Sequence, residues 1–336
     1  MLTLNTIKKR RTPLSLHVLL IFIICFTATS VVADQRSNQD GTQTIRPETT
    51  SGLHAFYQTL DYDWAQLEKG VPQLILESFP PDIQHSVSTS LKKRTFFMGL
   101  LPMVLLANQE IEAERVEILQ ILEKHKTEEL NDDDRERLET ISNRYGLRGH
   151  AFIDHRERSR LLRRVDTIPP ALVLAQAANE SAWGTSRFAQ RGNNLFGEWT
   201  FRPGTGIVPE GRPPGEIYEV RKFSSIYESI RSYMNNLNSN GAYRKLRDIR
   251  EKLRQDEKPV TGIALTTGLL KYSQRGEEYI QEIQAMIRQN RLSISNSAFL
   301  RQAETDRLIS TRTAGSGLFS SRNRMIGDLS TTGQNP

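Results

Sequence analysis

Cysteine is almost absent from the 336-residue sequence, and Cys25 is the single one. Cys25 lies inside an apolar run near the N-terminus, and it lacks the preceding small residue that a lipid-anchored bacterial signal needs. No cysteine remains once that run is removed. Disulfide frameworks, thiol nucleophiles and cysteine-ligated metal sites are therefore excluded for a mature chain.

Motifs of several other enzyme classes are also missing. The sequence contains no Gly-x-Ser-x-Gly, the nucleophile elbow of many serine hydrolases. His150 and His155 have no glutamate between them, and a metalloprotease pattern of the type His-Glu-x-x-His does not occur. We therefore expect no metal ion and no diffusible cofactor.

Acidic residues are missing from residues 1–33, which have the order of a secretory signal. A basic cluster at 8–11 precedes the apolar run 14–26, and Ala33 provides a small residue at the expected cleavage site. We expect a signal peptide over 1–33, a secreted or periplasmic product, and no stable membrane span after cleavage; an uncleaved anchor helix is the alternative. The other 41 Lys and Arg residues nearly balance 39 Asp and Glu, so charge gives no reason to expect a nucleic-acid partner.

Composition divides much of the remaining chain. Residues 34–52 lack aromatics and contain one aliphatic side chain, Ile45, which predicts a disordered linker. Apolar residues at helical spacing predict a helical N-terminal region over 53–148. Pro102 is expected to interrupt the helix there, so that a buried helix hairpin forms. The Ser/Thr-rich residues 293–336 predict a disordered tail.

The most informative pattern begins at Pro170. Proline suits the first turn of a helix, the alanine-rich residues that follow favour helix, and Gly184 is available to terminate it. Glu180 then falls in the last turn, where the helix dipole favours the protonated carboxyl. Partial burial against Trp183 and Phe188 would act in the same direction. Such a glutamate is suited to act as a general acid near neutral pH.

The residues around Glu180 resemble the signature of the glucosaminidase family that cleaves bacterial peptidoglycan, within the lysozyme-like superfamily. A longer stretch, from about 93 to 290, resembles the Bax-type bacterial proteins, in which a helical region precedes such a domain. The matching motifs are RVDxIP at 164–169, AQAAxES at 175–181, WG at 183–184, RFA at 187–189, NNxFGxW at 193–199, NLN at 236–238, AY at 242–243 and YSxRG at 272–276.

The resemblance implies a mainly α fold, with a lysozyme-like α+β glucosaminidase domain over 149–292 that carries a small β-hairpin lobe. It also implies an exported peptidoglycan hydrolase that acts on glycan strands. Such an endo-β-N-acetylglucosaminidase would cleave the β-1,4 bond after N-acetylglucosamine with Glu180 as general acid, and amidase activity is not expected. A lytic transglycosylase and a non-catalytic wall-binding or assembly protein are the alternatives.

A second catalytic group is expected on the lobe, because the resemblance implies that a carboxylate there can assist as base or stabiliser. The alternation near residue 219 favours a strand, and Glu219 is the first candidate, ahead of Glu216 and Glu210. An acetamido group of the substrate could replace this carboxylate. Tyr272 lies in a stretch that looks like the family's closing segment, in which a tyrosine lies near the catalytic glutamate; core packing is the alternative.

Six further side chains are candidates for substrate binding. Aromatic rings could stack on sugars or pack in the core, and asparagine amides could bind an acetamido group or cap their own backbone. The candidates are Trp183, Asn193, Asn194, Phe196, Trp199 and Tyr243.

One departure from the family pattern lies near Trp199. Bax-type sequences often carry a cysteine pair there, where this chain has Thr200 and Thr205. The resemblance therefore implies a lobe without its covalent staple.

Overall fold

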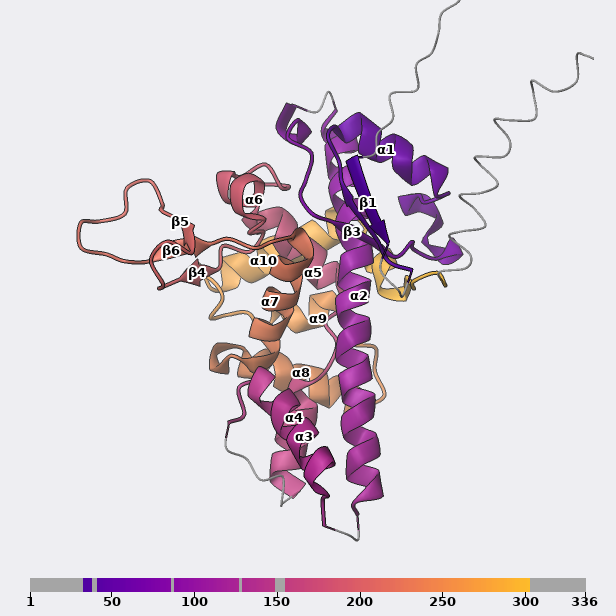
Figure 1. Ribbon diagram of the computed structural model, residues 1–336, viewed down its shortest axis with the longest axis vertical. Coiled ribbons are helices and arrows are strands. Elements are labelled where there is room, and N and C mark those ends of the chain that lie inside the picture. The colour runs from indigo at the N-terminus through magenta and orange to yellow at the C-terminus, as the bar shows by residue number, and fades with distance from the viewer. Residues whose placement is uncertain (1–32, 38–40, 86–87, 127–128, 149–154, 303–336) are drawn as a thin grey trace, which may run out of the picture. The chain divides into compact units, whose positions relative to one another are not determined.

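Helices dominate the described residues of the computed structural model, and the strands among them form two three-stranded sheets (Figure 1). The expectation of a mainly α fold with a small β lobe is confirmed. The structure describes residues 33–37, 41–85, 88–126, 129–148 and 155–302. Nearly all of the predicted signal peptide lies outside the described residues, as does most of the predicted tail.

The first sheet belongs to the N-terminal part of the chain. Strand β2 pairs antiparallel with β1 and parallel with β3, with Ile45 opposite Leu76. The elements of this part are β1 (Ala33–Ser37), β2 (Gln43–Arg46), α1 (Thr50–Thr59), η1 (Trp64–Lys69), β3 (Leu74–Leu76), η2 (Ile83–His85), α2 (Thr89–Lys124), α3 (Asp132–Arg144) and α4 (His155–Arg164).

The predicted disordered linker over 34–52 is wrong, because β1, β2 and the start of α1 occupy much of it. Strand pairing uses backbone groups, so a polar sequence can supply it. Ile45, the only aliphatic residue there, is buried. The Thr49 side chain caps α1 by accepting a hydrogen bond from the Gly52 N–H at 3.1 Å.

Helix α2 runs through Pro102, which was expected to break it. Proline lacks the N–H that would bond the carbonyl four residues earlier, here Met98. The Tyr62 hydroxyl donates to that carbonyl at 3.1 Å instead. Both residues are buried, so tertiary structure compensates for the lost helical bond. Within the described ranges, neither α2 nor another helix is long and apolar enough to cross a membrane.

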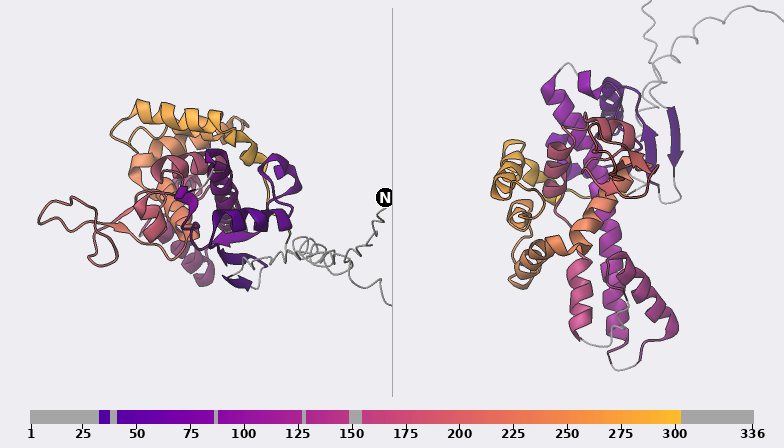
Figure 2. Two further views of the ribbon diagram at one scale, coloured as in Figure 1. Left: turned by 90° about the horizontal axis from the view of Figure 1, so that it is seen from above. Right: turned by 90° about the vertical axis from the view of Figure 1, so that its left-hand side faces the viewer.

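The C-terminal part contains the second sheet, in the order β4-β6-β5, which forms a lobe beside the helices (Figures 1 and 2). We call residues 198–222 the β-lobe. The elements are α5 (Pro170–Glu180), α6 (Arg187–Gly192), β4 (Trp199–Thr200), β5 (Gly206–Ile207), β6 (Glu219–Arg221), α7 (Ile226–Ser239), η3 (Gly241–Tyr243), α8 (Arg244–Gln255), α9 (Gly262–Thr266), α10 (Glu277–Gln289) and η4 (Leu292–Ser297).

Helix α5 lies at the centre of the hydrophobic core and is buried from Pro170 to Ala178. Helices α2, α9 and α10 and the short helix η4 pack against it (Figure 1). Tyr233 of α7 donates a hydrogen bond to its Gln176. The N-terminal helical region therefore shares one core with the domain that follows. Before α5, the fully buried Arg250 of α8 donates to the carbonyls of Asp166 and Thr167 at 2.9 and 3.0 Å, which fixes the entry to this helix.

The chain stays ordered beyond residue 293, where a disordered tail was predicted. Leu292 and Ser295 of η4 are buried, and Leu300 forms a parallel bridge with Val71. The buried Arg301 guanidinium donates to main-chain carbonyls of residues 60, 61 and 70. Burial of these few side chains explains the order up to residue 302.

Candidate active site

Helix α5 ends at Glu180 in an unusual turn. Ala182, Trp183 and Gly184 follow with φ of 50°, 62° and 75°, so three consecutive residues adopt the left-handed region. Such a conformation costs free energy at non-glycine residues and needs support from its surroundings. The buried Ser181 hydroxyl supports this turn. It donates a hydrogen bond to the Ala177 carbonyl at 2.6 Å and accepts one from the Gly184 N–H at 2.8 Å.

Helix α2 supports the same turn from outside the predicted domain. The Trp183 ring meets Phe96 and Phe97 edge-on, with centroids 5.9 and 5.2 Å apart, and the Lys93 ammonium lies 4.5 Å from its centroid. A Cβ on Gly184 would approach the Phe79 ring to 2.9 Å. These contacts favour the packing interpretation of Trp183 and hold the backbone that carries Glu180.

The carboxylate of Glu180 ends a chain of buried hydrogen bonds. The Tyr233 hydroxyl donates to Gln176 Oε1, and Gln176 Nε2 donates to the Tyr279 hydroxyl at 2.8 Å. The Tyr279 hydroxyl in turn donates to Glu180 Oε1 at 2.7 Å. Each of the three preceding residues is at most 1% exposed, so the chain is rigid and fixes the carboxylate orientation.

Burial raises the pKa of Glu180 above that of an ordinary glutamate. The hydrogen bonds from Tyr279 and Asn179 lower this pKa, and so does the charge of Arg275, whereas Glu282 raises it slightly. The increase in pKa caused by desolvation is larger than the decrease caused by these hydrogen bonds and by Arg275. The group therefore holds its proton to a higher pH than a solvated glutamate, which is the behaviour required of a general acid.

The tyrosine bonded to Glu180 is Tyr279, which the sequence reasoning missed, and not Tyr272. Tyr272 lies one ring further away, stacked on Tyr279 with centroids 5.2 Å apart and planes at 11°. The Tyr243 ring lies beyond Tyr272, with the centroids of these two rings 5.9 Å apart. Tyr279 is seven residues from Tyr272 in the same segment. A sequence signal for it exists, because it falls in the first turn of α10 facing the core.

The β-lobe holds Glu219 in a different environment. Its two carboxylate oxygens accept from the N–H groups of Gly204 at 2.9 Å and Gly206 at 2.7 Å. The Gly204 bond is the main cause that lowers the pKa of Glu219, with help from Gly206. Glu219 thus anchors the loop between β4 and β5. Of the other candidates, Glu216 is exposed and Glu210 pairs with Arg187 at 3.0 Å.

The two asparagines use their side chains within the protein. Asn194 Nδ2 donates to the carbonyls of Glu198 and Arg221 at 2.8 and 2.9 Å, and its Oδ1 accepts from the Glu198 N–H at 3.0 Å. Asn193 ends α6 with φ of 52° and donates to the Phe223 carbonyl at 3.2 Å. This geometry supports the backbone-capping interpretation, and it ties the 193–198 loop to β6.

The aromatic candidates divide by exposure. Phe196 is buried and stacks on Tyr233 with centroids 3.8 Å apart. Tyr243 is 8% exposed, whereas Trp199 is 53% exposed and lies 4.3 Å from the Tyr218 ring. Trp199 is therefore the one of these rings with a face open to a ligand.

A further carboxylate near this centre, Glu198, was not predicted. The Ser232 hydroxyl donates to its Oε2 at 2.7 Å, and Arg221 lies 3.7 Å away. Burial raises the pKa of Glu198. Burial raises the pKa of Tyr243, a hydrogen bond with Asn236 lowers it, and the charges of Glu198 and Glu180 raise it. The acidic residue between Gly197 and Trp199 was the available signal.

Other polar sites are less suited to catalysis. Within the residues described, no group of three or more His, Cys, Asp or Glu side chains could hold a metal ion. A pocket of about 330 Å³ between α2, α3 and α7 is rich in charge. Its Glu110 pairs with Arg231 at 2.7 Å and its Glu114 pairs with Arg144, so these charges stabilise the helix packing.

Known proteins are similar to the part of the chain that contains this site. The family described as mannosyl-glycoprotein endo-beta-N-acetylglucosaminidase matches residues 158–292. Protein bax of Escherichia coli strain K12 is 33% identical over 218 residues, which cover 64% of this chain and 76% of that protein. The crystal structure of the catalytic domain of the autolysin Auto from Listeria monocytogenes gives a TM-score of 0.34 at 16% identity, covering 63% of this chain and 92% of that one. This chain therefore belongs to the family of protein bax, and its glucosaminidase domain makes it a glycoside hydrolase.

Proposed function

We propose that this glycoside hydrolase cleaves the β-1,4 bond on the reducing side of N-acetylglucosamine in peptidoglycan, with Glu180 as the general acid. One observation carries the proposal: a half-buried carboxyl with a raised pKa, held by the Tyr279 hydroxyl at the end of α5. Membership of a glucosaminidase family supports the reaction class.

The hydrogen bonds to Glu180 suggest how the proton is used. Tyr279 and Asn179 both donate to Oε1, at 2.7 and 3.4 Å, so Oε2 is the oxygen left to carry the proton. Glu180 transfers this proton to the glycosidic oxygen as the bond to the anomeric carbon breaks. The Tyr279 hydroxyl then stabilises the new carboxylate, because it donates to the charged form.

A second group must stabilise the anomeric centre or activate water. Glu219 is occupied by two backbone N–H groups and Glu210 by Arg187, so we assign this role to the acetamido group of the substrate. The alternative that the geometry favours next is Glu198, whose Oε1 has no hydrogen-bond partner within the described residues. If water activation required Glu198, Glu198→Gln would lower the rate as much as Glu180→Gln.

We also propose that the protein is exported and acts outside the cytoplasm, since its substrate lies there and residues 1–33 have the order of a signal. N-terminal sequencing of the protein recovered from a bacterial host tests this step. A mature chain that begins near residue 34 is expected. Retention of residues 1–33 would contradict cleavage and favour the anchor helix.

Product analysis tests the reaction. Purified peptidoglycan is digested with the mature protein, and the new ends are identified by mass spectrometry after borohydride reduction, with Glu180→Gln as the matched control. Reducing N-acetylglucosamine ends are expected, and chelation of metals should leave turnover unchanged. A 1,6-anhydro ring would identify a lytic transglycosylase. No soluble product would indicate a wall-binding protein.

A further inference from the structure

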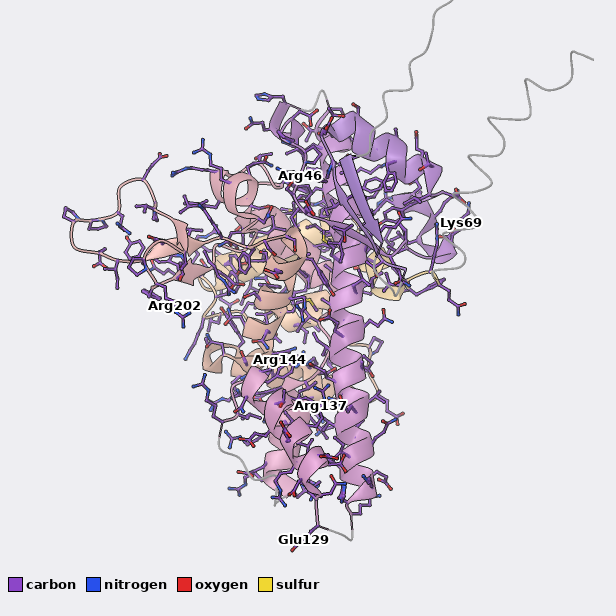
Figure 3. The ribbon with its side chains drawn as sticks, viewed as in Figure 1. Arg46, Lys69, Glu129, Arg137, Arg144 and Arg202 are labelled. Atoms are coloured by element: carbon purple, nitrogen blue, oxygen red, sulfur yellow. The ribbon has the colours of Figure 1, made fainter. Side chains whose placement is uncertain are left out.

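A surface pocket of about 480 Å³ lies on the β-lobe, outside the Glu180 centre. Two of its lining residues are aromatic, two are threonines and three are cationic, and no carboxylate side chain is among them. They are Trp199, Thr200, Phe201, Arg202, Thr205, Arg221 and Lys222. The pocket therefore joins an apolar surface to a concentration of positive charge; Figure 3 labels Arg202 on this lobe.

Two of the three cations have no acidic partner within the described part of the chain. Arg221 is held by Ser232 at 3.0 Å and lies near Glu198, whereas no ion pair or side-chain hydrogen bond engages Arg202 or Lys222. Two glutamates of the lobe interact with groups outside the pocket. Glu219 accepts backbone N–H groups and Glu210 pairs with Arg187, so neither neutralises the pocket.

The floor of the pocket is built to keep its shape. The Thr200 and Thr205 hydroxyls are hydrogen-bonded at 2.9 Å, and Glu219 holds the N–H groups on both sides of Thr205. Trp199 pairs with Val220 across the strands, and its ring leans on Tyr218. A rigid aromatic surface beside open cations loses little entropy when it binds a ligand.

We propose that this pocket binds a carboxylate of the peptide stem carried by the glycan strand, while Trp199 stacks on an adjoining sugar ring. The inference rests on the proposed function and deepens it, because it makes the stem part of the recognised substrate. An arginine guanidinium can donate two parallel hydrogen bonds to a carboxylate, and a lysine adds charge. Aromatic rings present the flat apolar surface that a sugar face needs.

Binding of a soluble disaccharide–peptide fragment tests the proposal without turnover. Calorimetry with the Glu180→Gln protein compares this fragment with one whose stem carboxylates are converted to amides. We expect the amidated fragment to bind about ten-fold more weakly, and this difference to shrink as salt screens the charges. The double variant Arg202→Ala, Lys222→Ala should remove the difference while the melting temperature stays unchanged.

The matched control is Lys245→Ala, Arg288→Ala, which removes one lysine and one arginine from the exposed surfaces of α8 and α10. It should keep the ten-fold preference. Equal binding of both fragments by the parent would overturn the proposal, and so would an equal loss for both fragments in the Arg202, Lys222 variant, since the pocket would then contact sugar alone.

Two outcomes separate this inference from the proposed function. A protein that cleaves no peptidoglycan but prefers the charged fragment would contradict hydrolysis and retain the stem-binding pocket. A protein that cleaves peptidoglycan with no such preference would do the reverse. Binding to phosphatidylglycerol vesicles through Arg202 and Lys222, without preference for the charged fragment, would assign the pocket to a lipid surface and overturn the proposal.

Discussion

The end of α5 and the β-lobe each hold a glutamate, and they treat it in opposite ways. Glu180 is half-buried and accepts hydrogen bonds from two neutral side chains, and its pKa is raised. Glu219 accepts two backbone N–H groups, and its pKa is lowered. One carboxyl is prepared to hold a proton and the other to stay charged.

This difference separates a chemical role from a structural one. A general acid must carry its proton at the working pH, whereas a loop anchor must accept hydrogen bonds with both oxygens. The same residue type serves both purposes because the environment sets its protonation state. The same glutamate-to-glutamine change is therefore expected to affect activity and stability differently at the two sites.

The largest expected effect is that of Glu180→Gln. Loss of general acid catalysis should lower kcat by about 10² to 10⁴-fold. Because the folded-state pKa of Glu180 is raised, the ionised group costs stability as pH rises through that pKa, and glutamine removes this cost. The variant should melt at the same or a higher temperature than the parent at neutral pH. Glu216→Gln, at an exposed position, is the matched control.

Peptidoglycan digestion followed by turbidity, with calorimetric melting curves, measures both effects. A folded Glu180→Gln protein that works at the parental rate would contradict the catalytic assignment. A markedly lower melting temperature would instead assign Glu180 a structural role at the end of the helix.

Tyr279→Phe should have the next largest effect. In the parent, the Tyr279 hydroxyl favours the ionised form of Glu180, so its removal raises the pKa of this acid. The decrease of kcat/KM on the alkaline side of the pH profile should therefore move to higher pH. Looser placement of the carboxyl should also lower the maximal rate by about 10- to 100-fold. Gln176 loses a buried acceptor, which costs about 1–3 kcal/mol of stability.

The pH profile of kcat/KM is the measurement, and Tyr272→Phe is its control because that ring stacks on Tyr279 without bonding Glu180. The control should keep the parental profile. If it shifted the profile as much as Tyr279→Phe, the hydrogen-bond assignment would be wrong.

Glu219→Gln should lower activity by less than about 10²-fold, below the range typical of a missing general acid. The amide nitrogen cannot accept a hydrogen bond, so one of the two glycine N–H groups loses its partner. Because the folded-state pKa of Glu219 is lowered, its contribution to the lobe is present above the ordinary glutamate pKa and is lost as pH falls through the lowered value.

Hydrogen exchange of the Gly204 and Gly206 amides measures this anchor. Relative to the intrinsic exchange rate at the same pH, loss of protection is expected in the variant at neutral pH and in the parent only in strongly acidic solution. A variant with protected amides and a rate as low as that of Glu180→Gln would show that Glu219 takes part in the chemistry.

The smallest effect is expected from Thr200→Cys, Thr205→Cys, which introduces a cysteine pair into the β-lobe. The two hydroxyls already bond at 2.9 Å, so the side chains point toward each other. On oxidation a disulfide should form and raise stability by about 2 kcal/mol or less, because the loop it closes is short. Melting temperatures before and after reduction check this, with Thr205→Cys alone as control. Free thiols after oxidation would contradict it.

Several parts of this structure could be predicted from local sequence. Pro170 starts α5, Glu180 falls in its last turn, and the residues near 219 form a strand. Each depends on backbone preferences and helix geometry that neighbours in the chain largely set. The errors lie where contacts are distant. Residues 43–46, which are polar except for Ile45, became a strand because β3 lies alongside. Pro102 stayed in α2 because Tyr62 bonds the Met98 carbonyl.

The sequence by itself determined that this chain has a helix ending in an acid, the ordered motifs of a glucosaminidase, and a small β lobe. Only the tertiary structure decided which tyrosine bonds Glu180, that Glu219 anchors a loop, and that helix α2 supports the turn through Trp183. The physical reason is that burial and hydrogen bonding set the charge and orientation of a carboxyl. The groups responsible lie far from it along the chain, 99 residues away for Tyr279.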